Sequence, residues 1–236
     1  MAWEGITGRI IINGLATANY AEDLGILFLN EWTHETADAL YSSSKRTGPI
    51  KLDYRLINGT NVYGDAGARF SFDFVSGTSY CMRLVNGAID TTFSFMIDNH
   101  TMTIIAADFV SMVPYTTDVL SFGIGQRYDI LVNSSEATVD FWMHAIPQAG
   151  CTTNEDADDI KGIVRYDVSS TSDPTTTAYC YSDSCEDEPM VSLVPYLELD
   201  VDEITVEDDL TDTARKNIDS LLRWYISSTT FVVGYN

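Results

Sequence analysis

The chain has 236 residues, of which 45% are apolar, so it is long enough and apolar enough to bury a hydrophobic core. The 35 Asp and Glu residues and 13 Lys and Arg residues give a formal net charge of −22. This charge argues against nucleic acids and anionic membrane surfaces as partners, because both carry negative charge themselves. The acidity favours solubility, or a secreted protein that works at acid pH, where some carboxylates are neutralised.

The first apolar stretch, Gly8–Ile12, predicts a β-strand and not a signal peptide. Glu4 precedes it, and Arg9 and Asn13 interrupt it. If the protein is secreted, we therefore expect its export signal upstream of this chain. No apolar run in the sequence approaches the length of about 20 residues that a membrane-spanning helix needs.

Alternating apolar and polar residues mark the middle of the chain as β-structure. Arg69–Phe74 alternates strictly and places three Phe side chains on one face. Phe93 and Phe95 share a face in the same way. Aromatic residues at this spacing are usually packed inside a protein, so we expect them, with Trp32 and Trp142, in the core.

Further short strands follow the same pattern, separated by turn residues such as Asn86-Gly87. They are expected at Leu24–Leu29, Tyr80–Val85, Thr92–Met96, Met102–Ala106, Tyr128–Val132, Phe141–Ile146 and Gly162–Tyr166. Many short strands at regular spacing indicate an all-β sandwich or barrel. One short helical turn is expected over Glu35–Tyr41.

After residue 168 the composition changes to that of a linker. Ser169–Thr177 is rich in Ser, Thr and Pro, and the acidic runs Asp183–Glu188 and Glu198–Asp209 are typical of solvated surface. A strand pattern returns at Leu221–Val233, close to the last residue. Because no partner strand follows it, we interpret it as the start of a further domain.

Four cysteines allow one or two disulfides. Cys151, Cys180 and Cys185 lie in polar, loop-like segments, which suits an oxidising compartment, and no Cys-x-x-Cys pair supports a zinc site. The pattern Asn-x-Ser/Thr marks three candidate glycosylation sites, which suit a secretory route. They are Asn58, Asn99 and Asn133.

Several ordered segments together resemble the second domain of fungal laccase-type multicopper oxidases. The main ones are Ile97–Asp108, Pro114–Asp118 and Gly123–Val132, with Leu29–His34, Leu56–Asn61 and Lys161–Asp167 as further matches. The resemblance implies an all-β fold, a cupredoxin-like Greek-key β-sandwich or barrel. It also implies that the chain is divided into four segments. Residues 1–25 would be the terminal strand of a truncated first domain and 26–170 a complete second domain. Residues 171–220 would be an acidic linker and 221–236 the first strand of a truncated third domain.

The family oxidises phenolic molecules one electron at a time and reduces O₂ to water with copper held by its first and third domains. Its copper ligands are His-x-His pairs and a Cys-flanked His cluster, and this chain has only His34, His100 and His144, at other spacings. We therefore expect no copper bound by this chain and no oxidase activity from it alone. The resemblance implies a secreted enzyme fragment that spaces the missing domains and supplies part of the phenol cleft.

The resemblance also points to individual residues of the phenol cleft. Asp90 lies seven residues before Ile97, at the position of the family's substrate-pocket acid, which would take the proton of a phenol as it is oxidised. An ordinary turn aspartate would look the same in the sequence. Gln148 and Ala149 match one wall of the cleft, and Pro49 and Ile50 match another.

The same resemblance bears on the cysteines and the histidines, although Cys81 and Cys180 depart from the family's pattern. Cys151 and Cys185 match a cysteine pair of ascomycete-type laccases and are expected to form a disulfide that ties the linker to the second domain. Cys81, inside a strand pattern, is expected to be a buried free thiol. The histidines are expected to be hydrogen-bonded structural residues at strand ends or domain contacts.

Two other classes remain open as alternatives to an enzyme fragment. The first is a stand-alone, non-catalytic cupredoxin-like scaffold or binding protein. The second is an immunoglobulin-like adhesion module, which fits the strand number but not the spacing of Cys and Trp residues.

Overall fold

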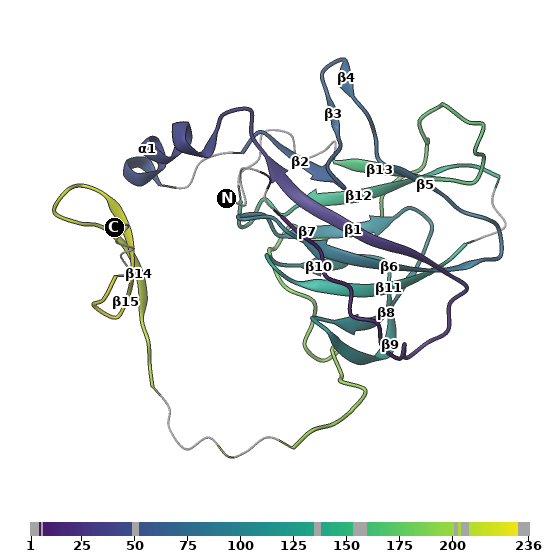
Figure 1. Cartoon of the computed structure of the whole chain (residues 1–236). Coiled ribbons are helices and arrows are strands. Elements are labelled where there is room, and N and C mark those ends of the chain that lie inside the picture. Colours follow the sequence, from purple (N-terminus) through teal and green to yellow (C-terminus); the bar gives the residue numbers. More distant parts are fainter. Residues whose placement is uncertain are drawn as a thin grey trace. The chain divides into compact units, whose positions relative to one another are not determined.

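The computed structural model describes residues 5, 7–48, 52–134, 138–152, 160–200, 203 and 208–230. These residues form two compact units. The first unit takes its residues from 1–33 and 52–198 and contains a β-sandwich (Figure 1). The second unit takes its residues from 34–51 and 199–236 and contains one helix and one hairpin.

One sheet of the sandwich has six strands in the order β2-β1-β6-β11-β8-β9. The strands are β1 (Glu22–Trp32), β2 (Tyr54–Ile57), β6 (Ser79–Asn86), β8 (Met102–Ala107), β9 (Val110–Thr117) and β11 (Arg127–Asn133). Strands β1 and β6 are parallel, and the other neighbours are antiparallel. The sheet is open, with β2 and β9 at its edges.

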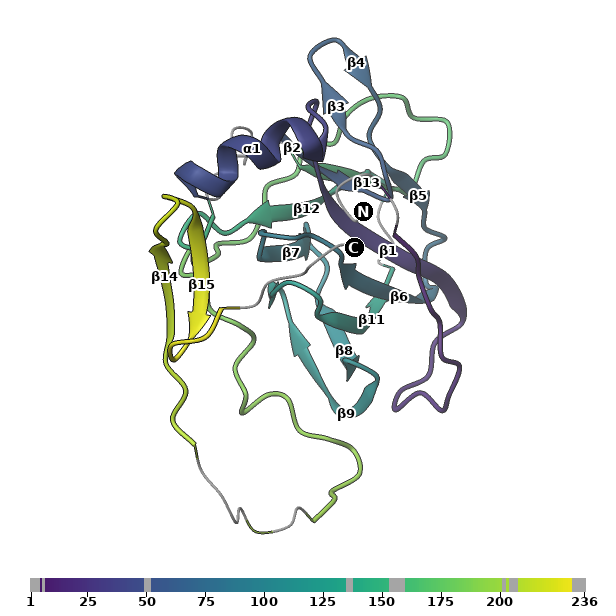
Figure 2. The same ribbon diagram turned by 60° about the vertical axis from the view of Figure 1, so that its left-hand side comes forward.

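The second sheet has five strands in the order β10-β7-β12-β13-β5 (Figure 2). They are β5 (Ser71–Asp73), β7 (Phe93–Ile97), β10 (Leu120–Phe122), β12 (Phe141–Pro147) and β13 (Lys161–Arg165). A small separate hairpin pairs β3 (Val62–Tyr63) with β4 (Ala66–Gly67). The all-β prediction is therefore confirmed, and the expected strands from Leu24 to Tyr166 are present with ends shifted by a few residues.

The hydrophobic core lies between the two sheets. Ser71 and Asp73 face solvent, while the three Phe side chains of Arg69–Phe74 pack on the core, as their alternation predicts. Phe93 and Phe95 are fully buried in β7, where every residue is buried. Strand β7 is covered on both faces, and so its sequence does not alternate cleanly.

The two predicted core tryptophans behave differently from the phenylalanines. Trp32 is 46% exposed, so its prediction as a core residue is wrong. The preceding Glu31 side chain points inward, and the alternation of a strand then directs Trp32 outward. Trp142 is only half-buried, with the cations of Arg69 and Lys161 over its ring at 5.5 and 5.4 Å.

The predicted strand at Gly8–Ile12 is also wrong. Residues 8–12 have no regular secondary structure, and Ile10 and Ile12 are 77% and 65% exposed. An apolar run becomes a strand only beside a hydrogen-bonding neighbour, and the described part of the chain pairs none with this segment. Further along, Thr17 donates to the carbonyl oxygen of Ile105, which attaches the N-terminal segment to β8.

The second unit contains α1 (Ala37–Thr47), which is longer than the predicted turn at Glu35–Tyr41. Thr36 caps its N-terminus by accepting the Ala39 N–H, and basic residues lie in its last turn, where they favour the helix dipole. The unit also contains a hairpin of β14 (Asp212–Lys216) and β15 (Leu222–Ile226). The strand pattern predicted at Leu221–Val233 therefore pairs, through β15, with a strand that precedes it. The sequence pattern did not predict β14, because its sequence is rich in charged residues and every residue in it is exposed.

The segment from 176 to 197, which we call the strap, packs on the sandwich instead of running through solvent. Thr176 donates to Asp98 Oδ2 at 2.6 Å, and Val113 N–H donates to Val194 O at 2.8 Å. Glu188 is only 7% exposed, so the prediction that the acidic run 183–188 is solvated surface is wrong at this residue. Residues 171–198 belong to the first unit.

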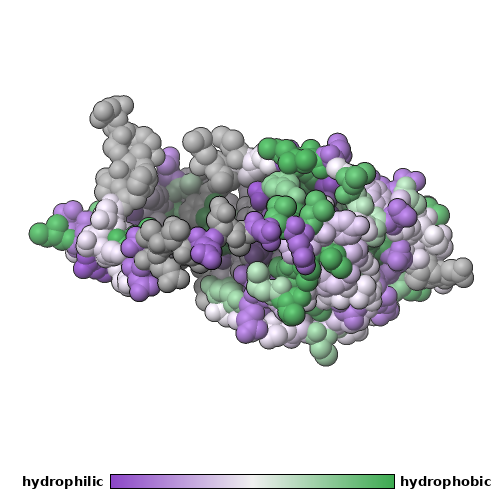
Figure 3. Space-filling view, turned by 90° about the horizontal axis from the view of Figure 1, so that it is seen from below, coloured by the Kyte–Doolittle hydropathy of each residue, from purple (hydrophilic) through white to green (hydrophobic). Residues whose placement is uncertain are grey.

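The surface of the molecule mixes apolar and polar groups. Figure 3, from the side on which β9 lies in Figure 1, shows green apolar groups among purple polar ones. Val110 and Val113 of β9 are 46% and 45% exposed, and Phe109 in the preceding turn is 57% exposed. The single described helix is too short and too polar to cross a membrane.

Candidate functional site

The candidate site is built around the loop 87–92, which joins β6 to β7 and carries Asp90. Asn86 is 1% exposed, and its amide donates to a backbone carbonyl of the loop at 2.8 Å. Gly87 lies against the Phe28 ring, and a Cβ there would come within 2.1 Å of a ring carbon. Only glycine therefore fits at this position without a displacement of the Phe28 ring.

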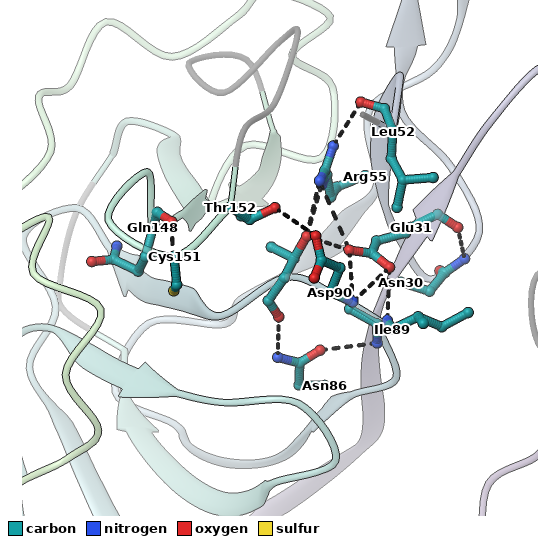
Figure 4. A network of polar contacts seen from close by, with 12 residues as sticks. Asn30, Glu31, Leu52, Arg55, Asn86, Ile89, Asp90, Gln148, Cys151 and Thr152 are labelled. Atoms are coloured by element: carbon teal, nitrogen blue, oxygen red, sulfur yellow. Dashed lines mark hydrogen bonds and ion pairs between the residues drawn. The ribbon is translucent and has the colours of Figure 1, made fainter. Parts of the chain in front are cut away.

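The carboxylate of Glu31 reaches this loop from strand β1 (Figure 4). Its oxygens accept the backbone N–H of Ile89 at 2.7 Å and that of Asp90 at 3.1 Å, and they also accept the Thr91 hydroxyl. The Glu31 side chain is 2% exposed. A buried carboxylate with several donors is stable only when its charge is also balanced.

Arg55 of β2 supplies that balance. It is 1% exposed, and its Nη2 lies 3.8 Å from Glu31 Oε1. Its Nε and Nη2 both donate to Thr91 Oγ1 at 3.0 Å, and its Nη1 donates to Leu52 O at 3.1 Å. Burial lowers the pKa of Arg55, and the carboxylates of Glu31 and Asp90 oppose that effect. A guanidinium keeps its proton in such a site.

Asp90 itself is half-buried beside the turn that follows β12. Its Oδ2 accepts the Thr152 hydroxyl at 3.1 Å (Figure 4). Among the described residues, no hydrogen bond reaches Oδ1. An ordinary turn aspartate bonds to its own backbone two residues on, whereas this carboxylate reaches across to another element. One oxygen is held and the other is available, which suits a proton acceptor.

The turn 148–152 positions Thr152 and contains the predicted wall residues Gln148 and Ala149. Gln148 is 1% exposed and donates to Ser94 Oγ at 2.7 Å. In this conformation its side chain supports the turn from inside and does not line a cleft. Ala149 is exposed, and its N–H donates to Asp183 Oδ1 of the strap at 2.6 Å.

The disulfide between Cys151 and Cys185 is present, with the two Cα atoms 5.6 Å apart. It joins the turn 148–152 to the strap, as the resemblance implies. Cys81 is a buried free thiol, and burial raises its pKa to about 12, so it is unreactive at neutral pH. Cys180 is free and exposed.

The remaining predicted positions lie elsewhere. Pro49 and Ile50 fall outside the described residues. Asn99 and Asn133 are exposed, at a turn and at the end of β11. Asn58 is half-buried, and its Oδ1 accepts the Phe28 N–H at 2.8 Å, so part of this side chain is already engaged.

The histidines do not form the donor set that copper needs. Among the described residues, no group of three or more His, Cys, Asp and Glu side chains could hold a metal ion. His100 bonds Asp98 O and Tyr166 Oη, both at 2.7 Å, and His144 Nε2 bonds Asp98 Oδ1 at 2.9 Å. Burial lowers the pKa of His100. The chemistry of a copper centre therefore cannot be assigned to these residues.

Four residues of the site were missed in the sequence: Glu31, Arg55, Thr91 and Thr152. The one available signal was a charged residue inside an apolar strand pattern, as at Glu31 in Leu27–Trp32. A charge on the inward face of a strand needs a buried partner. The identity of that partner, 24 residues away in β2, is not readable from spacing.

The two-sheet sandwich has the cupredoxin-type fold of multicopper oxidases, as comparison with known proteins shows. The family model "Multicopper oxidase" matches residues 23–185. The laccase from Botrytis aclada superposes with a TM-score of 0.88 at 41% identity, covering 92% of this chain and 42% of that structure. The chain belongs to the multicopper oxidase family.

Two relatives from Botryotinia fuckeliana are similar in sequence. Laccase-2 is 42% identical over 243 residues, which cover 99% of this chain and 41% of the relative. Laccase-1 is 46% identical over 198 residues, which cover 83% of this chain and 35% of the relative. The chain thus spans about two fifths of the length of the curated relatives that it matches.

Proposed function

We propose that this chain is the middle part of a laccase-like oxidase that removes one electron at a time from phenolic substrates and reduces O₂ to water. In this proposal residues 26–170 hold the second cupredoxin domain, flanked by the end of a first domain (1–25), by the linker (171–220) and by the start of a third domain (221–236), although residues 8–12 form no strand and β15 pairs with the preceding β14. The chain spaces the copper-binding domains and contributes one wall of the phenol cleft.

The proposal is carried by two observations together: the chain matches an oxidase over almost its whole length, and its described residues contain no metal-binding cluster. Laccase-2 matches 99% of the chain, yet the described residues hold no cluster fit for a metal ion. Copper chemistry would then be supplied by the rest of the enzyme, and this chain by itself would bind no stoichiometric copper and oxidise no phenol.

The chemical contribution of this chain is made by Asp90. A phenol that loses an electron becomes a much stronger acid, so a carboxylate beside its hydroxyl eases the oxidation by accepting the proton. The hydrogen bond from Thr152 leaves Oδ1 free for that proton. Ala149 is exposed on the neighbouring turn and would form part of the wall, with Pro49 and Ile50 proposed for another part.

The cell compartment follows from the same proposal. We expect secretion, with glycans at Asn99 and Asn133, where the asparagines are exposed. A glycan on Asn58 would be attached to the side-chain nitrogen, while Oδ1 continues to accept the Phe28 N–H. The Cys151–Cys185 disulfide suits an oxidising compartment.

A chimaera tests the proposal. The matching segment of Botryotinia Laccase-2 would be replaced by this chain, and copper content and oxidation of a methoxyphenol would be measured. We expect the chimaera to bind copper and to oxidise the phenol, and the isolated chain to do neither. Blue absorbance or phenol turnover by the isolated chain would contradict the proposal, and an inactive chimaera would favour a stand-alone scaffold.

A further inference from the structure

The backbone beneath Asp90 is held by one buried carboxylate. Glu31 accepts the N–H groups of Ile89 and Asp90 and the hydroxyl of Thr91, so three consecutive residues are bonded to one side chain. These contacts span 58 to 60 residues of sequence. The direction in which the Asp90 Cα–Cβ bond points is therefore set by Glu31.

Arg55 fixes Glu31 and the Thr91 hydroxyl at the same time. Because Nε and Nη2 of Arg55 both donate to Thr91 Oγ1, the hydroxyl proton is directed at Glu31. With Glu31 2% and Arg55 1% exposed, neither can exchange these partners for water without a large desolvation cost. These buried contacts restrict the conformations that the loop can adopt.

Thr152 fixes the side chain of Asp90 from the opposite side. Thr152 is 6% exposed, and its N–H donates to Gln148 O at 3.2 Å. The adjacent Cys151 is bonded to Cys185 of the strap. The hydroxyl that holds Asp90 Oδ2 is therefore carried by a turn that is itself anchored twice.

We propose that Glu31 and Thr152 are positioning residues for Asp90: Glu31 orients its backbone, and Thr152 orients its carboxylate so that Oδ1 faces a phenol hydroxyl. This inference rests on the proposed role of Asp90 as proton acceptor. Proton transfer needs the two oxygens within hydrogen-bond distance, and a displacement of about 1 Å can reduce a rate by about 10²-fold.

The test uses the chimaera of Laccase-2 and two electron donors. A methoxyphenol releases a proton when it is oxidised, and ferrocyanide does not, so only the phenol depends on the position of Asp90. The variants are Glu31→Gln, in which one acceptor oxygen becomes an NH₂ group facing the loop donors, and Thr152→Val, which removes the hydroxyl at nearly constant shape. Asp90→Asn is the reference, and Glu188→Gln, a buried carboxylate of the strap, is the matched control.

We expect Asp90→Asn to lower the ratio of phenol to ferrocyanide kcat/KM by about 10²-fold. Glu31→Gln and Thr152→Val should each lower the same ratio by about 5- to 50-fold, which is less than the effect expected for Asp90→Asn, because the base is displaced and not removed. Glu188→Gln should leave it unchanged. Hydrogen exchange at the amides of Ile89 and Asp90 in the isolated chain should become faster in Glu31→Gln.

The outcomes separate the two proposals. If Asp90→Asn leaves the ratio unchanged, the proposed role of Asp90 is wrong. If Asp90→Asn lowers the ratio while Glu31→Gln and Thr152→Val do not, or lower both donors equally, the positioning inference alone is wrong. Should Glu31→Gln fail to fold, Thr152→Val decides the matter, because it removes one hydroxyl and no charge.

Discussion

Removal of the Cys151–Cys185 disulfide should destabilise the first unit substantially. The double variant Cys151→Ser/Cys185→Ser opens a loop whose ends are 34 residues apart in sequence. The loop-closure relation gives about 3–4 kcal/mol for a loop of this length, acting mainly on the unfolded chain. Against a typical total stability of about 5–15 kcal/mol, this loss is large.

The folded strap should remain docked in this variant, because other contacts hold it. Ala149 N–H bonds Asp183, the carbonyl of Val194 accepts a β9 amide, and Glu188 is buried. The stability loss should therefore appear in equilibrium urea unfolding as a lower midpoint, with spectra of the native state unchanged. The strap should become protease-sensitive only near the unfolding transition.

The matched control is Cys180→Ser, since Cys180 is exposed and free. A surface substitution of this kind should change stability by less than about 0.5 kcal/mol. If the double variant lost less than about 1 kcal/mol, the loop-closure reasoning would be refuted. The unfolded chain would then have to keep residues 151 and 185 close together without the bond.

The remaining predictions concern charge and packing. Burial raises the pKa of Glu188 above its ordinary value. The free energy of unfolding should therefore fall as pH rises from that ordinary value through the raised pKa. In Glu188→Gln, the free energy of unfolding measured in urea should depend less on pH. Burial tends to raise the pKa of Asp140, but hydrogen bonds, chiefly from Arg165, have the larger combined effect and lower it. The contribution of Asp140 to the free energy of unfolding should therefore be present at neutral pH and lost as pH falls through that lowered pKa. Phe93→Ala should cost about 3–5 kcal/mol and exposed Phe109→Ala less than about 1 kcal/mol in the same assay.

Each of these has a contrary result. A Glu188→Gln profile parallel to that of the parent would show that this carboxyl is not the titrating group. An Asp140→Asn variant as stable as the parent at pH 7 would show that its hydrogen bonds are replaceable by water. Equal losses for Phe93→Ala and Phe109→Ala would contradict the assigned burial.

Residues whose role is set by their neighbours in sequence were predictable. Period-two alternation decides which face a side chain joins, so Arg69–Phe74, Phe93 and Phe95 were correctly expected on the core. The buried thiol of Cys81 follows from an equally local pattern, because Cys81 lies within an alternating strand sequence. The ordered family matches added the disulfide pair and pointed to Asp90.

Predictions failed where an element needed a distant partner. The Gly8–Ile12 stretch has strand composition and no neighbour in the described chain, while the charged β14 is a strand because β15 pairs with it. Glu188 lies in an acidic run and is buried because the strap packs on the sandwich. Composition reports an average preference, and packing overrides it.

From the sequence alone came the all-β class, the family and the loop that carries the candidate acid, because alternation, turn residues and ordered motifs are local properties. Only the tertiary structure decided what holds that acid in place. Glu31, Arg55 and Thr152 come from three elements, and the contacts that join Arg55 to Glu31, Glu31 to Asp90 and Thr152 to Asp90 span 24, 59 and 62 residues. Such a meeting depends on which strands pair and how the two sheets pack, and a buried charge is stable only where that packing brings its partner to it.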